Sequence, residues 1–170
     1  MENLIEEISK KSKSAFQIIS TSSIQKRNSA ILNISKLLKQ YTHKILDANK
    51  LDLDNAVKKK LASSFIDRLT LNEVRIKNMC DGLEEISTLA DPIGKKIESW
   101  DRPNGLKIEK VSVPLGIIGI IYESRPNVTI DAGSLCIKSG NVSILRGGSD
   151  SFHSSKLLAN LMQEGLEQSN

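Results

Sequence analysis

A run of apolar residues from Leu115 to Tyr122 constrains the fold of this chain more than any other feature. Apolar side chains occupy successive positions, so a strand built from this run has two apolar faces. That pattern is typical of a parallel strand that is buried between two helical layers. The run therefore predicts the first strand of a parallel sheet.

The residues after this run extend the same pattern. A polar corner at 123–127 leads into a helix over 128–138, which ends at Ser139-Gly140-Asn141. A second apolar strand is predicted over 142–145, and an amphipathic helix begins at about Ser151. The order strand, helix, strand, helix predicts a parallel, right-handed βαβα unit over residues 114–170.

Residues 1–94 are predicted to form a helical layer that packs on another part of the fold. Apolar residues recur at helical spacing over 4–19 and 24–41, and Thr42 is a candidate cap for a third helix. Thr70-Leu71-Asn72-Glu73 has the pattern of a capping box, in which the hydroxyl accepts from a free amide and the glutamate reaches back. The helix that it opens is expected to stop at Asp91-Pro92-Ile93-Gly94.

Residues 95–113 are predicted to form a β-hairpin. The strands are expected over 97–100 and 106–113, around Arg102-Pro103-Asn104-Gly105, whose Asn-Gly pair favours a tight reversal. In the second strand the apolar positions shift from even to odd numbers. This shift indicates a β-bulge near Glu109-Lys110.

Length and composition exclude several classes of protein. The chain has 170 residues, of which 39% are hydrophobic and 26% charged, so it suits one domain or slightly more and is not a disordered polymer. No apolar run approaches the roughly 18–20 residues of a membrane span. The first ten residues also lack the apolar block of a signal peptide. We therefore expect a cytoplasmic protein that does not enter a membrane.

The charge pattern does not predict a nucleic-acid partner. The net charge is +4, but the basic residues are scattered apart from Lys58-Lys59-Lys60. Only one Trp, two Tyr and three Phe are available for stacking on bases. A solvated lysine-rich face is the more natural interpretation.

The cysteines and histidines form no catalytic or metal-binding pattern. Cys80 and Cys136 are too few and too isolated for a disulfide framework or a zinc site, and both are expected to be buried and inert on helices. His43 and His153 have no partners at useful spacing. The residues alone therefore predict no metal ligand and no catalytic nucleophile.

The candidate binding residues lie in the two loops that follow the predicted parallel strands, where ligands of open α/β sheets bind. The second loop is Arg146-Gly147-Gly148-Ser149-Asp150. Its glycines would let the backbone approach a ligand, while the arginine, the serine and the amides that open the next helix would hold an anion. A glycine turn with a surface arginine is an equally plausible interpretation.

The first loop, Glu123-Ser124-Arg125-Pro126-Asn127, combines an acid, a hydroxyl, a guanidinium and an amide. Arg125 is suited to a carboxylate or a phosphate, although ordinary turn chemistry around the proline explains the loop equally well. The chain has neither a G-x-G-x-x-G fingerprint nor a Walker A motif. Gly116 and Gly119 are predicted to lie inside the strand and to serve close packing.

At these loops the sequence closely resembles gamma-glutamyl phosphate reductase, of the aldehyde dehydrogenase superfamily. The resemblance runs in order from about Asp67 to Ser155. It covers the stretches Asp67-Arg68-Leu69-Thr70-Leu71-Asn72-Glu73, Arg102-Pro103-Asn104-Gly105-Leu106, the whole of 113–129, Cys136-Ile137-Lys138-Ser139-Gly140-Asn141 and Ile144-Leu145-Arg146-Gly147-Gly148-Ser149.

The resemblance implies an aldehyde-dehydrogenase-like α/β fold, with a partial Rossmann-type parallel sheet preceded by a helical layer and the hairpin of a bridging, oligomer-forming sheet. It also implies NADPH-dependent reduction of L-glutamate 5-phosphate to the semialdehyde and phosphate, a step of proline biosynthesis. In that reaction a cysteine thiolate displaces phosphate from the acyl phosphate, and hydride from NADPH reduces the resulting thioester.

The same resemblance assigns roles to the two loops. Arg146, Gly147, Gly148 and Ser149 match the motif expected near the adenosine and its 2′-phosphate. Tyr122 and Glu123 match the corner beside the nicotinamide. Ser124, Arg125 and Asn127 are the candidates for contacts with the substrate.

This chain also departs from the family. Family members are more than twice as long, and their nucleophilic cysteine lies in a downstream domain, so we expect an N-terminal portion that is inactive alone. Local departures are Asp150 in place of glutamate and Ser143 in place of alanine. The alternatives are a non-catalytic nucleotide- or phosphate-binding remnant and one half of a split enzyme. Because the strands are patterned for neighbours, we expect self-association or pairing with a separate C-terminal polypeptide.

Overall fold

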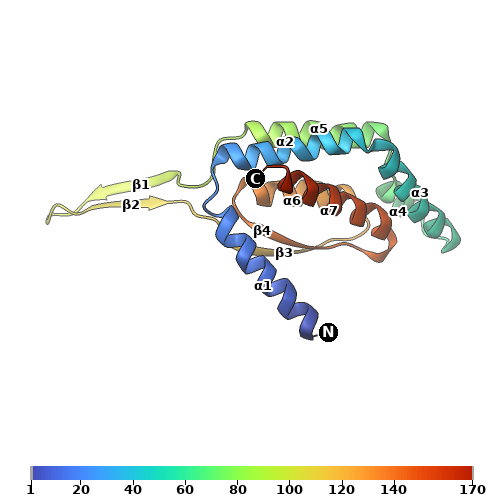
Figure 1. The fold of residues 1–170 in the computed structure, drawn as a ribbon, viewed down its shortest axis with the longest axis horizontal. Helices are drawn as coiled ribbons and strands as arrows, with labels where there is room; N and C mark the ends of the chain where they lie inside the picture. The colour runs from blue at the N-terminus through green and yellow to red at the C-terminus, as the bar shows by residue number, and fades with distance from the viewer. Residues whose placement is uncertain (1, 170) are drawn as a thin grey trace.

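The chain folds into a body of helices and a small parallel sheet, from which a hairpin projects (Figure 1). A computed structural model describes residues 2–169. In chain order, the elements are α1 (Glu2–Ile19), α2 (Ile24–Gln40), α3 (Thr42–Lys58), α4 (Ser63–Leu69), α5 (Glu73–Thr88), β1 (Lys96–Asp101), β2 (Lys107–Val111), β3 (Ile117–Ile121), α6 (Asn127–Lys138), β4 (Val142–Arg146), a 3-10 turn η1 (Ser149–Ser151) and α7 (Phe152–Glu167).

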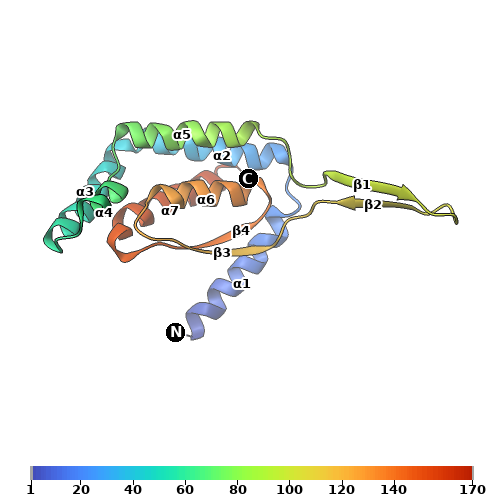
Figure 2. The ribbon, with the colours of Figure 1, turned by 180° about the vertical axis from the view of Figure 1, so that it is seen from behind.

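The hydrophobic core lies between helices. Helices α2 and α5 pack side by side and cover α6 and α7, which lie between them and the sheet (Figures 1 and 2). Fully buried side chains from these helices fill the core, among them Ile31, Ile34 and Leu38 of α2, Leu83 of α5, Ile130 of α6 and Leu158 of α7. Helices α2 and α5 of the predicted helical layer thus pack on the helical part of the βαβα unit.

Helix α5 begins two residues later than the capping box predicted. The cap of α5 is Asn72, whose Oδ1 accepts a hydrogen bond from the Arg75 amide at 2.8 Å. The predicted capping hydroxyl of Thr70 instead donates to the Ile66 carbonyl at 2.7 Å, because Thr70 ends the short, unpredicted helix α4. The prediction of a capping box was therefore wrong. Helices α4 and α5 follow each other within a few residues, so that Thr70 caps the end of α4 and Asn72 caps the start of α5.

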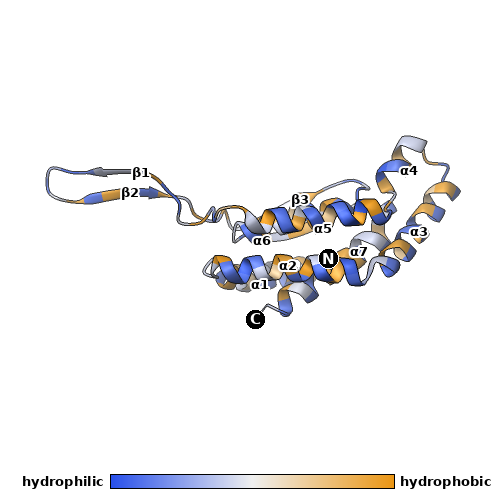
Figure 3. Cartoon of the chain, turned by 90° about the horizontal axis from the view of Figure 1, so that it is seen from above, coloured by the Kyte–Doolittle hydropathy of each residue, from blue (hydrophilic) through white to orange (hydrophobic). Residues whose placement is uncertain are grey.

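The hairpin extends away from the helices (Figures 1 and 3). Strands β1 and β2 pair antiparallel, and Gly105 takes a positive φ of 82° at the reversal. The register shifts between Lys96 and Glu98, opposite the step from Val111 to Lys110, so the extra residue is Ile97 on β1. The bulge predicted at Glu109-Lys110 is thus next to the observed irregularity but on the wrong strand.

Strands β3 and β4 pair in parallel, with Ile117 opposite Val142 and Ile121 opposite Arg146, and α6 connects them. The predicted strand, helix, strand, helix order is confirmed. Helix α1 lies on the face of this sheet opposite α6 and α7 (Figures 1 and 2). Covering on both faces is nevertheless incomplete, because Ile121 is 86% exposed. Within residues 2–169 the sheet has only two strands, so neither strand is as buried as predicted.

The two glycines near β3 do not serve the close packing that was predicted. Gly116 precedes the strand and takes a φ of 124°, a conformation that other residues rarely adopt. A Cβ added to Gly119 would meet no atom within 4 Å. Gly116 is therefore explained by its backbone conformation, whereas packing within residues 2–169 gives no reason for Gly119.

Candidate functional site

The two predicted binding loops lie side by side at the carboxyl edge of the sheet. The amide of Tyr122 donates to the Arg146 carbonyl at 3.0 Å, which continues the pairing of β3 with β4 by one residue. Parallel pairing thus brings 122–127 and 146–150 to one edge, as the sequence predicted.

The glycines of the second loop allow this loop to contact the first. A Cβ on Gly147 would lie 3.1 Å from Cζ and Oη of Tyr122, and a Cβ on Gly148 would lie 3.1 Å from the Ser124 Oγ. The Tyr122 hydroxyl is in turn 2.7 Å from the Thr129 Oγ1, which fixes the ring over Gly147. Packing between the loops therefore explains both glycines without any ligand.

The side chains of the first loop differ in how free they are to bind a ligand. Glu123 and Arg125 are exposed, whereas Ser124 is buried against Gly148. The Asn127 amide donates to the Asp131 carboxylate at 2.8 Å. Desolvation raises the pKa of Asp131, and this hydrogen bond opposes the rise. Arg125, the one cation of this loop, is thus exposed to solvent and available to an anionic ligand.

The second loop presents two exposed side chains, those of Arg146 and Ser149. The backbone amides of Gly147 and Gly148 donate no hydrogen bond within residues 2–169. A guanidinium beside two free amides is chemically suited to phosphate oxygens.

The amides that open α7 are occupied by the protein itself, which corrects the prediction that they would hold an anion. The Asp52 carboxylate accepts from the His153 amide at 3.0 Å and from the Ser154 amide at 2.8 Å. It also accepts from the Ser154 hydroxyl at 2.6 Å. A buried carboxylate at a helix N-terminus is stabilised by these donors and by the helix dipole.

Sequence reasoning missed Asp52 and its neighbour Asn49. Asn49 donates to the Leu69 carbonyl at 2.8 Å and to the Ser154 Oγ at 3.1 Å, and it accepts from the Leu71 amide at 2.7 Å. A signal was present, because Ile45, Asn49, Asp52 and Ala56 recur at the spacing of one helix face and all are buried. Two polar residues on that face indicate a buried polar network.

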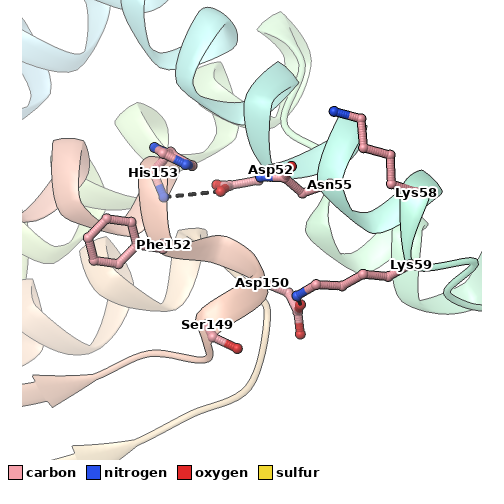
Figure 4. Close-up of a pocket in the computed structure, with 8 residues that line it drawn as sticks. All are labelled: Asp52, Asn55, Lys58, Lys59, Ser149, Asp150, Phe152 and His153. Atoms are coloured by element: carbon pink, nitrogen blue, oxygen red, sulfur yellow. Dashed lines mark hydrogen bonds and ion pairs between the residues drawn. The ribbon is translucent and has the colours of Figure 1, made fainter.

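A polar pocket of about 430 Å³ lies between α3 and the start of α7 (Figure 4). Of the predicted site residues, only Ser149 lines it. Its other polar lining includes Asp52, Lys58 and Lys59, and the Lys59 ammonium pairs with the Asp150 carboxylate at 2.6 Å. Arg146 is not part of its wall, so this pocket and the arginine are separate features of the same loop.

Both cysteines are buried, as predicted. Burial raises the pKa of the Cys80 thiol and of the Cys136 thiol. Cys136 lines a second, mainly apolar pocket of about 330 Å³ at the base of the hairpin. A thiol that is buried and held protonated is a poor nucleophile.

Residues 2–169 contain neither a metal-binding cluster nor a helix that could span a membrane. Nowhere in this range do three or more His, Cys, Asp or Glu side chains come together in a way that could hold a metal ion. None of the described helices combines the length and apolarity needed to cross a bilayer.

The comparisons with curated proteins and with solved structures both find gamma-glutamyl phosphate reductases. No family model matches the chain. The chain is 51% identical over 164 residues to the gamma-glutamyl phosphate reductase of Brucella suis, a match that covers 96% of this chain and 39% of that protein. The crystal structure of gamma-glutamyl phosphate reductase from Thermotoga maritima superimposes with a TM-score of 0.93 at 41% identity, covering 95% of this chain and 39% of that one. The chain therefore spans about two fifths of the length of these relatives.

A more distant structure has the same fold. A NAD-dependent benzaldehyde dehydrogenase from Corynebacterium glutamicum superimposes with a TM-score of 0.69 at 16% identity, over 91% of this chain and 31% of that one. At this identity the likeness concerns the fold alone. The predicted aldehyde-dehydrogenase-like α/β fold is confirmed.

Proposed function

We propose that this chain forms part of the nucleotide-binding side of a reductase of the gamma-glutamyl phosphate reductase type. The chain is a homologue of that enzyme, within the aldehyde dehydrogenase superfamily, and matches about 39% of the length of such proteins. The reaction proposed for the complete assembly is the NADPH-dependent reduction of L-glutamate 5-phosphate to the semialdehyde. NADPH, when bound, would supply the hydride.

The observation that carries this proposal is the pairing of the two loops at one sheet edge. The Tyr122 amide bonds to the Arg146 carbonyl, so an exposed guanidinium and two free amides lie beside the corner at 122–127. These groups fit a nucleotide phosphate, for which Arg146 and the amides of Gly147 and Gly148 would be the donors. Ser149 would add a hydroxyl from the exposed end of the loop.

On the substrate side, Arg125 is the strongest candidate of the first loop. Its side chain is exposed, and a guanidinium matches the oxygens of a carboxylate or a phosphate. Asn127 is engaged with Asp131, and Ser124 is buried. We assign these two residues to the shape of the corner, and we propose that Tyr122 and Glu123 flank the nicotinamide.

We further propose that the chain alone does not catalyse the reduction. The reaction needs a thiolate, and the sequence contains two cysteines, both buried with a raised pKa. Neither lies in the loops at the sheet edge. A cysteine from another polypeptide, or from a further part of the same protein, would have to reach the site.

The uncovered sheet supports a proposal about partners. Ile121, at the end of β3, is 86% exposed, and Leu115 and Val113, which precede this strand in the chain, are 87% and 71% exposed. Uncovered apolar surface at a sheet favours association. We propose that this surface is covered in the functional assembly, by a second copy or by a separate polypeptide. Light scattering behind size-exclusion chromatography would reveal a second copy, and a sharply monomeric chain at high micromolar concentration would contradict self-association.

NADPH titration and turnover assays test the functional proposal together. We expect NADPH binding that Arg146→Ala weakens by roughly 1.5–3 kcal/mol, the cost of losing a charge-assisted hydrogen bond. Arg102→Ala, which removes an exposed arginine at the hairpin reversal, is the matched control and should not change the affinity. Equal affinities for wild type and Arg146→Ala would remove the assigned phosphate site.

The turnover assay separates the two candidate functions. Neither NADPH oxidation with the acyl phosphate nor the phosphate-dependent reverse reaction is expected from this chain alone. Robust turnover would overturn the claim of inactivity. The chain could bind NADPH and still show no turnover after addition of a polypeptide that supplies the rest of a relative. That result would favour a non-catalytic nucleotide-binding module, in which the loop at 146–150 would bind the nucleotide in the same way.

A further inference from the structure

We propose that Asp52 is a built-in anion that closes the N-terminus of α7 to phosphate, so that a bound nucleotide phosphate must be held by Arg146 and the loop amides instead. The first part of this inference stands on the contacts of Asp52. The second part rests on the proposed function.

The N-terminus of α7 lacks a cap from its own sequence. Ser151 occupies the cap position, and its side chain makes no capping hydrogen bond. Asp52, about a hundred residues earlier in the chain, supplies the acceptors for the amides of the second and third residues of the helix. Figure 4 shows the carboxylate of Asp52 directed at His153.

The position of Asp52 is fixed from several sides. The residue is 2% exposed, and its Oδ2 also accepts from the Ser154 hydroxyl. That hydroxyl oxygen is an acceptor for Asn49 as well, and Asn49 binds the backbone at Leu69 and Leu71. The carboxylate is thus part of a buried network that joins α3, the α4–α5 junction and α7. This network holds it at the N-terminus of α7.

The pocket beside Asp52 would otherwise suit an anion. Lys58, Lys59 and His153 line it, and the amides of α7 would open into it if the carboxylate were removed. With the carboxylate present, those donors are used and a second negative charge would be repelled. The Lys59 ammonium is also paired with Asp150. The lysines at this pocket therefore do not form a phosphate site in the wild-type chain.

The same geometry assigns phosphate recognition to the other end of the loop. Arg146 and the amides of Gly147 and Gly148 carry no competing acceptor within residues 2–169. A nucleotide that approaches the sheet edge meets free donors there, whereas the amides of His153 and Ser154 further along the chain are already bound to Asp52. Asp52 thereby determines which part of the loop receives the phosphate.

The test is a titration with inorganic phosphate at constant ionic strength, followed by thermal unfolding. The variants are wild type, Arg146→Ala, Asp52→Ala and the double variant Asp52→Ala/Arg146→Ala. We expect no saturable gain in Tm for Arg146→Ala. We expect the double variant to have a lowered Tm in buffer. Phosphate should raise this Tm with half-saturation at millimolar concentration, which is an affinity at least tenfold tighter than any that Arg146→Ala shows. Asp54→Ala, which removes an exposed carboxylate of the same helix, is the matched control and should behave as wild type.

Two results would overturn the inference. One is a double variant whose Tm phosphate does not raise. The other is a phosphate-dependent gain in Arg146→Ala that Lys59→Met abolishes, because phosphate would then occupy the pocket while Asp52 is present. Should Asp52→Ala be unfolded in buffer, recovery of helical circular dichroism with phosphate replaces Tm as the readout. Asp52→Asn, which keeps an acceptor but loses the charge, must then be less stable than Asp54→Ala, and equal stability would also overturn the inference.

This experiment uses no nucleotide, so its outcome is independent of whether NADPH binds. If the wild-type chain fails to bind NADPH, the proposed function fails while the closure of α7 by Asp52 stands. If NADPH binds and Arg146→Ala weakens it, but phosphate does not restore the double variant, the functional proposal survives and the role of Asp52 falls.

Discussion

The backbone of Gly147 lies directly against the ring of Tyr122, so that a Cβ at position 147 would be 3.1 Å from both Cζ and Oη of the tyrosine. The ring cannot easily move away, because its hydroxyl is held at 2.7 Å from the Thr129 Oγ1. The close contact joins the two loops that carry nearly all the candidate binding residues.

We therefore expect Gly147→Ala to lower the free energy of unfolding by about 1–3 kcal/mol, the usual cost of overpacking. The measurement is urea unfolding followed by circular dichroism. Gly119→Ala is the matched control, because a Cβ there meets nothing within 4 Å, and it should be neutral or slightly stabilising. If both alanines behaved alike, contact with Tyr122 would not be the reason for a glycine at 147.

Two helical glycines should respond to alanine in opposite directions. At Gly165 of α7, a Cβ would lie 2.9 Å from the Ile34 backbone nitrogen and 3.1 Å from its Cα, where α7 crosses α2. Backbone cannot yield as a flexible side chain can, so we expect Gly165→Ala to cost about 2–3 kcal/mol.

Gly82 of α5 gives the contrasting case, because a Cβ there meets nothing within 4 Å. Alanine is the better helix former, so Gly82→Ala should stabilise the chain by roughly 0.5–1 kcal/mol. Differential scanning calorimetry would measure both variants. A destabilised Gly82→Ala, or a Gly165→Ala as stable as wild type, would contradict the packing described for the two helices.

Local patterns in the sequence predicted the elements that depend on neighbouring residues. The apolar stretches at 115–122 and 142–145 predicted β3, β4 and their common edge, because parallel pairing follows from the order of the elements. The start of α5 was misplaced, because both Thr70 and Asn72 are good caps and only the end of α4 decides between them. Periodicity also could not place the extra residue of the hairpin at Ile97 rather than on β2, since either strand can carry the bulge.

The largest gap concerns Asp52, whose partners are about a hundred residues away in the chain. A helix N-terminus looks the same in sequence whether a ligand or a distant carboxylate occupies it. The prediction of an anion at α7 was thus right about the chemistry and wrong about the source of the anion.

The ion pair between Arg27 and Asp91 ties α2 to the segment that leads into the hairpin. The Arg27 Nη2 donates to the Asp91 Oδ2 at 2.7 Å, while Nε and Nη1 have no partner within residues 2–169. Because Arg27 is only 3% exposed, Asp91→Asn would leave a buried cation without its counter-charge. We expect a loss of roughly 2 kcal/mol in unfolding free energy, less than for a fully buried pair because the carboxylate is partly exposed.

A double variant separates charge from packing at this pair. Arg27→Met/Asp91→Asn should recover most of the stability, since the buried guanidinium is removed together with its counter-charge. The control is Asp67→Asn, which breaks the exposed pair with Arg75 and should cost under about 1 kcal/mol. Equal losses for Asp91→Asn and Asp67→Asn in chemical unfolding would show that burial of Arg27 does not matter.

Lys138 of α6 gives the chain a pH dependence whose sign follows from its surroundings. Its ammonium donates to the Asn28 Oδ1 at 2.8 Å and to the Ser87 carbonyl at 3.0 Å, both neutral groups. Burial lowers the pKa of Lys138 below its ordinary value of 10.5, although the nearby Asp91 partly opposes the shift. Between the lowered pKa and 10.5 the unfolded chain therefore binds more protons than the folded one, and the contribution of Lys138 to stability rises with pH.

We expect the unfolding free energy of wild type minus that of Lys138→Met to be constant near neutral pH and to increase as the pH rises toward 10.5. Urea unfolding from pH 7 to 10 would measure the difference, in which the titration of other groups cancels. Lys36→Met, which removes an exposed lysine of α2, is the control and should show no such increase. A difference that falls with pH would mean that the folded state favours the charged lysine, and that the neutral acceptors and Asp91 outweigh the cost of burying it.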